Sequence, residues 1–108
     1  MENTKFKLRQ STSKSLGMSY KIIRTDEYFK KLQKFFKKHP DALDRYIKAI
    51  ELLEVNPFHP SLRLHKLQGK LNVYHSVSIN MKYRIVIDFI LVDKEIIPID
   101  IGTHDEVY

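Results

Sequence analysis

The last seven residues of the chain, Gly102-Thr-His-Asp-Glu-Val-Tyr108, gather polar side chains at one tip. Histidine has an unperturbed pKa that lets it gain or lose a proton near neutral pH, so His104 is a candidate acid or base. The tip follows an apolar run that ends at Ile101 and reads as a strand. A rigid strand that delivers polar residues at its end is how a scaffold presents them to a ligand. A solvated chain terminus is the alternative interpretation.

The composition excludes several classes of protein. The chain has five histidines and no cysteine, which excludes disulfides and thiolate metal sites and favours a reducing cytoplasm. No two histidines have the spacing of a metal-binding pair on one element, so neither a metal nor a cofactor is expected. The apolar runs are short and interrupted, which argues against a membrane span. Residues 1–18 lack the apolar stretch of a signal peptide.

The formal net charge of +6 is unevenly distributed. Residues 62–87 contain five basic side chains and no carboxylate, whereas residues 88–108 contain one basic and six acidic side chains. A basic surface on a small domain is typical of proteins that bind nucleic acid or acidic partners. Residues 1–19 are basic and lack hydrophobic periodicity, and we interpret them as a flexible tail before a single domain, residues 20–108.

Two amphipathic helices are predicted after a short strand at Tyr20–Thr25. Asp26 offers an N-cap, and apolar side chains then recur at helical spacing, namely Phe29, Leu32, Phe35 and Phe36. Pro40 ends this helix because proline disfavours helical geometry in the residue before it. Asp41 then begins a second helix, which Asn56-Pro57 terminates. A break this short predicts an antiparallel helical hairpin.

The rest of the chain predicts strands joined by turns, with the clearest strands at Tyr74–Ile79, Tyr83–Val92 and Glu95–Ile101. The expected fold class is α+β: an N-terminal strand, a helical hairpin, and an antiparallel sheet of three to four strands with the helices on one face. The other face is expected to be open. Its polar positions are Tyr74, Ser76, Ser78 and Arg84.

Five short segments follow one another in a recognisable order: Asn56-Pro57, Arg63-Leu-His65-Lys-Leu-Gln-Gly69, Tyr74-His-Ser-Val-Ser-Ile-Asn80, Tyr83-Arg84-Ile85-Val86, and Gly102-Thr-His104 through Tyr108. Over residues 20–108 their order and spacing resemble the RelE/YafQ/ParE superfamily, the toxins of type II toxin–antitoxin systems. The resemblance implies a RelE-like fold of the microbial ribonuclease type. It also implies a cytoplasmic endoribonuclease that cuts mRNA on the ribosome without a metal and is neutralised by a cognate antitoxin.

The resemblance also assigns roles to residues. The YafQ-like histidines fall on His65 and His104, the terminal aromatic falls on Tyr108, and the basic position of the RelE-like Tyr-Arg strand falls on Arg84. These four are the predicted catalytic residues. Metal-free RNA cleavage needs a base, an acid and a cation for the phosphate, and an aromatic ring stacks an unpaired base. Residues predicted to contact RNA are Arg63, Lys66, His75 and Lys82.

Two features leave alternatives open. His75 alternates with the apolar Val77 and Ile79, so a structural role competes with RNA binding. Ser78 stands where many relatives carry a basic residue, which bears on the level of activity. A non-nuclease ParE-like toxin acting on DNA gyrase, or an inactive relative that only binds an antitoxin, is the alternative function. The histidines at 65 and 104 favour the nuclease, because ParE-like members lack them.

Overall fold

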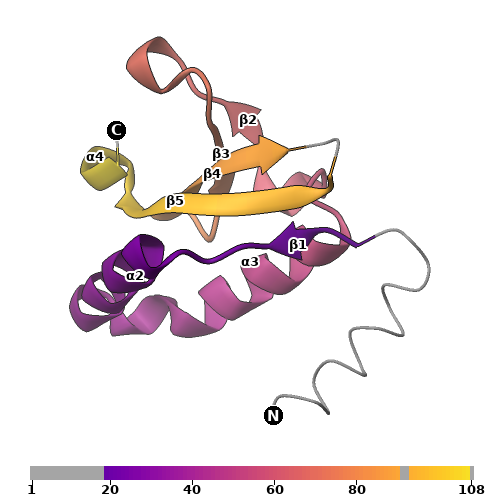
Figure 1. The fold of residues 1–108 in the computed structure, drawn as a ribbon. Coiled ribbons are helices and arrows are strands. Elements are labelled where there is room, and N and C mark those ends of the chain that lie inside the picture. The colour runs from indigo at the N-terminus through magenta and orange to yellow at the C-terminus, as the bar shows by residue number, and fades with distance from the viewer. Residues whose placement is uncertain (1–18, 91–92, 108) are drawn as a thin grey trace.

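The structure is a computed structural model that describes residues 19–90 and 93–107. Most of the predicted tail and the candidate Tyr108 lie outside the described residues. The elements follow the predicted order, α+β, as Figure 1 shows. They are β1 (Lys21–Ile22), α2 (Asp26–Lys38), η1 (Pro40–Ala42), α3 (Leu43–Val55), η2 (Pro60–Leu62), β2 (His65–Lys66), η3 (Gly69–Leu71), β3 (His75–Ser78), β4 (Tyr83–Ile90), β5 (Glu95–Thr103) and α4 (His104–Val107).

Both predicted helices are present, with small shifts at their starts. The Thr25 hydroxyl accepts a hydrogen bond from the Tyr28 amide at 3.1 Å, so Thr25 is the N-cap of α2 instead of the predicted Asp26. The 3₁₀ turn η1 takes up the start of the second helix, and α3 therefore begins at Leu43 instead of Asp41. No helix of the described ranges combines the length and apolarity needed to cross a membrane.

The sheet has five strands in the order β1-β5-β4-β3-β2. Neighbouring strands are antiparallel except for β1, which runs parallel to β5 at one edge. The predicted α+β layout is confirmed, and two-residue strands at both edges enlarge the predicted sheet. In Figure 1, α2 and α3 cover one face of the sheet, and the segment between β2 and β3 rises from the other side.

Two hydrophobic clusters lie on opposite faces of the sheet. The larger fills the space between the helices and the sheet and includes Leu53, Ile85 and Ile87, all fully buried. The smaller consists of Leu67, Val86 and Val107. Because side chains alternate along a strand, β4 contributes to both clusters.

The face opposite the helices is less open than predicted. Ser76 and Ser78 are only 0% and 7% exposed. They share this face with Val86 and Arg84, their partners in the β3–β4 register. Leu67 and Val107 cover part of the face from segments distant in the sequence, which a strand pattern alone cannot reveal.

Replacing Ile85 by alanine should reveal how much the fold depends on the larger cluster. Ile85→Ala is expected to lower the free energy of unfolding by about 2–5 kcal/mol, because it opens a cavity in the centre of the sheet. Urea denaturation measures the change. Ile47→Ala, at a helix position that is 46% exposed, is the control and should change it by less than about 1 kcal/mol. Equal losses in the two variants would contradict this description of the core.

Candidate functional site

A reciprocal pair of hydrogen bonds fixes the C-terminal tip. The Glu106 amide donates to Thr103 Oγ1 at 3.2 Å, and the Thr103 amide donates to Glu106 Oε1 at 2.8 Å. This is a capping box, in which two residues three apart satisfy each other's backbone donors at a helix start. His104 is therefore held as the first residue of α4, and Val107 is buried. Up to Val107, the tip is therefore a folded helical turn whose outer side chains are exposed.

Gly102 is required for this arrangement. A Cβ atom at Gly102 would lie 2.8 Å from Glu106 Oε1 and 3.2 Å from Val107 Cγ1. Any side chain would therefore push α4 away from the end of β5. The glycine permits the close return of the chain that places His104 beside the sheet.

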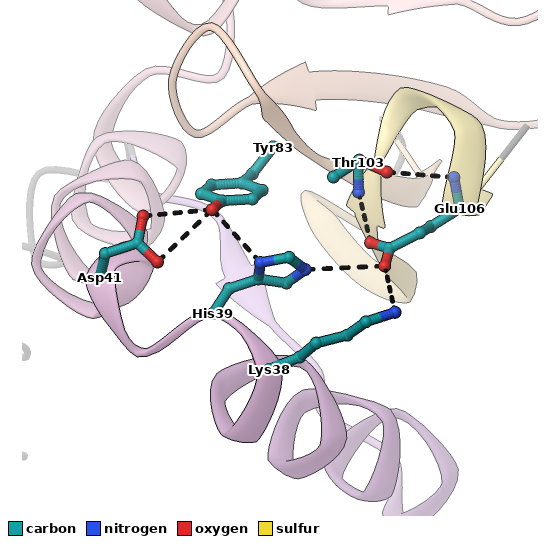
Figure 2. Close-up of polar contacts among 6 residues, drawn as sticks. All are labelled: Lys38, His39, Asp41, Tyr83, Thr103 and Glu106. Carbon is teal, nitrogen blue, oxygen red and sulfur yellow. Dashed lines mark hydrogen bonds and ion pairs between the residues drawn. The ribbon is translucent and has the colours of Figure 1, made fainter.

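A polar network anchors the tip to the helical hairpin (Figure 2). Glu106 Oε2 lies 2.9 Å from Lys38 Nζ and 3.6 Å from His39 Nε2. The second distance is too long for a hydrogen bond, so that contact becomes an ion pair only when the imidazole is protonated. On the other side of the ring, His39 Nδ1 lies 3.3 Å from the Tyr83 hydroxyl, which donates to Asp41 Oδ2 at 3.1 Å. The network thus links α2, η1, β4 and α4.

The network also changes the acidity of its members. The pKa of Glu106 falls to about 2, first because the carboxylate accepts the Thr103 amide and then because it accepts from Lys38. The pKa of the Tyr83 phenol is raised, first by burial and then by its hydrogen bond to Asp41. Glu106 therefore stays ionised and Tyr83 neutral across the physiological range.

The structure brings two of the predicted residues to the same cavity. His104 and Lys82 both line a cavity of about 260 Å³, together with His39, Tyr83, Thr103 and Asp105. The side chain of His104 is 68% exposed, and its Nδ1 lies 3.6 Å from Asp105 Oδ1. An accessible imidazole next to a lysine offers acid–base chemistry beside a cation for an anionic substrate.

Arg84 lies on the face of the sheet opposite the helices, next to Tyr83, which lines the cavity. In the register of the sheet it pairs with Gly102 on β5 and with Ser78 on β3. Arg84 Nη1 donates to Ser78 Oγ at 3.1 Å, so the serine orients the guanidinium. A lysine or arginine at position 78 would repel the Arg84 guanidinium, whereas the Ser78 hydroxyl accepts its hydrogen bond.

His65 lies apart from this group. It is on β2, the edge strand, and β3 and β4 separate it from β5. Three strand spacings correspond to about 14 Å across the sheet. The His65 ring is exposed, its Nδ1 lies 3.1 Å from the Arg63 carbonyl oxygen, and its register partner is Ser76. The cavity of about 260 Å³ that His104 lines does not include His65.

His75 lies on the helix-facing side of β3, opposite to Arg84. Its ring is in edge contact with Phe89, at 5.6 Å between centroids. Burial lowers its pKa, and the nearby charges of Lys66 and His65 lower it further. A neutral ring packed on an aromatic ring fits the structural alternative for this residue. Lys66, its partner in the β2–β3 register, is exposed.

The donor set at the tip favours acid–base and phosphate-binding chemistry. Within residues 19–90 and 93–107, no three histidine, aspartate or glutamate side chains gather as metal ligands. Glu106 is engaged by Lys38 and its own helix cap, and Asp41 by Tyr83. The cavity itself is lined by two imidazoles, a lysine and a single carboxylate, that of Asp105.

No family model matches this chain, and no curated protein sequence does. Its structure, however, is similar to solved toxin structures. A mutant of YafQ from E. coli is 18% identical, with 82% of this chain and 98% of that chain covered and a TM-score of 0.66. The E. coli DinJ–YafQ toxin–antitoxin complex is 18% identical, with 83% and 98% covered and a TM-score of 0.66. This chain has the RelE/YafQ-type fold.

A third similar structure is the YoeB/ParE toxin from Agrobacterium tumefaciens, which is 17% identical with a TM-score of 0.62. It covers 78% of this chain, and this chain covers 98% of it. The resemblance inferred from the order of sequence segments is thus confirmed for the fold.

Sequence reasoning missed the residues that hold the tip of this RelE/YafQ-type fold in place. No role was predicted for His39 or Tyr83, whose contacts join segments far apart in the sequence. One local signal was available for Glu106. The Thr103-x-x-Glu106 spacing is that of a capping box and predicts the helix start directly.

The capping box and the lowered pKa of Glu106 predict a pH-dependent contribution to stability. Glu106→Ala removes both the cap and the charge and is expected to lower the free energy of unfolding by about 1 kcal/mol at pH 7. Glu106→Gln keeps a cap-competent side chain and should lose less. Urea denaturation at several pH values measures both variants.

The sign of the pH effect follows from the folded pKa of about 2, which is below the usual value of a glutamate. The charge of Glu106 stabilises the fold fully above the unfolded pKa, and this contribution is lost as the pH falls through the folded pKa. The stability difference between the wild type and Glu106→Gln should therefore shrink between about pH 4.5 and pH 2. A difference that grows on acidification would contradict the network.

Proposed function

We propose that this chain is the toxin of a type II toxin–antitoxin system and acts as an endoribonuclease on mRNA without a metal. The observation that carries the proposal is the shared cavity of His104 and Lys82 at the tip. Arg84, oriented by Ser78, lies on the strand next to it. The similarity of the fold to the YafQ and YoeB/ParE structures supports the same conclusion.

The proposed chemistry uses the ribose 2′-hydroxyl as the nucleophile. Its oxygen bonds to phosphorus while the bond from phosphorus to the 5′-oxygen breaks, which leaves a 2′,3′-cyclic phosphate and a 5′-hydroxyl. One proton leaves the 2′-oxygen and one reaches the 5′-oxygen. His104 exchanges one of these protons and water the other. Lys82 and Arg84 balance the charge that develops on the phosphate oxygens.

The remaining predicted residues are proposed to bind RNA around this centre. His65, Arg63 and Lys66 extend the basic surface toward the edge strand β2, so we assign His65 to the RNA backbone and away from the reacting phosphate. Tyr108 lies outside the described residues and keeps its proposed role in stacking a base.

A cognate antitoxin is the proposed protein partner, and the ribosome the proposed place of action in the cytoplasm. One of the similar structures is a toxin–antitoxin complex by name, DinJ–YafQ. A basic chain of net charge +6 is complemented by an acidic segment that folds on binding. Such a segment would cover the surface that otherwise binds RNA.

Expression of His104→Ala is expected to relieve growth arrest while the fold stays intact. Loss of a general acid or base lowers the rate of cleavage by about 10²–10⁴-fold. Growth curves after induction and primer extension on a translated reporter measure the effect, with cuts expected within codons for the wild type alone. Circular dichroism checks that the variant is folded.

His59→Asn is the matched control, since His59 does not line the cavity at His104 and asparagine retains a side chain that can cap the turn η2. This variant should remain as toxic as the wild type. Full toxicity of His104→Ala would overturn the catalytic assignment. Intact mRNA together with inhibited DNA supercoiling would instead favour the gyrase-directed alternative.

A further inference from the structure

A basic groove lies next to the candidate site, and we propose that it binds the RNA strand beyond the nucleotides at His104; this inference rests on the proposed function. The groove has a volume of about 800 Å³ and is formed by α3, η2 and the β3–β4 turn. Its cationic rim is made by Arg45, Lys48, Arg63 and Lys82.

The positive charge of the rim is not paired with acidic side chains of the described residues. None of the described residues that line the groove is an aspartate or a glutamate, and no ion pair within the described ranges involves a rim residue. Arg45 and Lys48 project from α3 three residues apart, so they lie on the same side of that helix. Exposed like charges around a hollow favour a bound polyanion.

The backbone at Arg63 is a second, independent observation. Arg63 has a φ of 50°, in the left-handed region that a side chain other than glycine or asparagine rarely adopts. Its amide donates to the Pro60 carbonyl oxygen at 3.1 Å, which closes the turn η2. Strained residues of this kind cluster at ligand sites, and here the strain brings a cation to the groove.

Lys82 connects the groove to the candidate site. It lines both the groove and the cavity that contains His104. A strand with one phosphate at His104 can therefore pass Lys82 and enter the groove without leaving the cationic surface. Between the cations the groove also has apolar side chains, Ala49, Leu52, Leu62 and Ile79, which suit a ribose or base. This continuity favours RNA over an acidic peptide.

The test compares binding of a fluorescent 2′-O-methyl RNA 12-mer, which lacks the nucleophile, to full-length variants over a range of salt concentrations. The plot of log affinity against log salt has a negative slope, and Arg45→Gln/Lys48→Gln should make it less steep by about 1.4, because two phosphate contacts are lost. Asparagine tolerates the left-handed backbone, so Arg63→Asn should keep the turn and make the slope less steep by about 0.7.

Lys30→Gln/Lys37→Gln is the matched control, since it removes the same charge from exposed positions of α2 that line none of the described cavities. Its slope should stay near that of the wild type. Equal slopes for the two double variants would overturn the proposal that the groove binds RNA. A glutamate 12-mer that displaces the labelled RNA more strongly than unlabelled RNA does would also overturn it.

Growth arrest separates the inference from the proposed function. If arrest depends on His104 but the groove variants bind RNA with the wild-type slope, only the groove is wrong. If the wild-type chain binds no RNA and His104→Ala still arrests growth, both are wrong. A less steep slope in the groove variants supports RNA binding in the groove, whichever residue carries out the cleavage.

Discussion

The carboxylate of Glu106 is the contact on which the candidate site depends. One oxygen accepts the amide of Thr103, and the other faces Lys38 and His39 of the helical hairpin. A four-residue helix has no stability of its own, because helix nucleation costs more than one turn returns. The position of His104 is therefore set by this tertiary anchor and by burial of Val107.

Strand β4 connects that anchor to the face of the sheet that carries Arg84 and Ser78. Tyr83 points to the helices and joins the network through its hydroxyl, whereas Arg84, the next residue, lies on the opposite face with Ser78. The alternation of a strand thus places a structural side chain and a candidate functional one on consecutive residues. A change in the register of β4 would exchange the two and disconnect both.

The parts of the fold that could be predicted are those with local periodicity. The helical hairpin and the long strands repeat their apolar residues every 3.6 or 2 positions, so the sequence predicts them well. The parallel pairing of β1 with β5 could not be predicted, since a two-residue strand carries no pattern. Burial of Ser76 likewise depends on the cover supplied from Leu67 and Val107.

For the site, the types of residue were predictable, but their grouping was not. Strands β3 and β4 separate His65 from β5, and His104 shares its cavity with Lys82.

The absence of a cation at position 78 is explained by the distribution of charge. Ser78 is 7% exposed and accepts a hydrogen bond from Arg84 at 3.1 Å, so a second cation there would be desolvated beside the first. The turn at Lys82 and the outer residues of α3 remain in water, where cations cost little to hold. On the proposed path, cations on this rim contact an RNA strand that passes His104, because an extended strand offers a phosphate at every nucleotide. On the two neighbouring strands β3 and β4, Arg84 is therefore the only lysine or arginine, and the cations of the rim lie outside these strands.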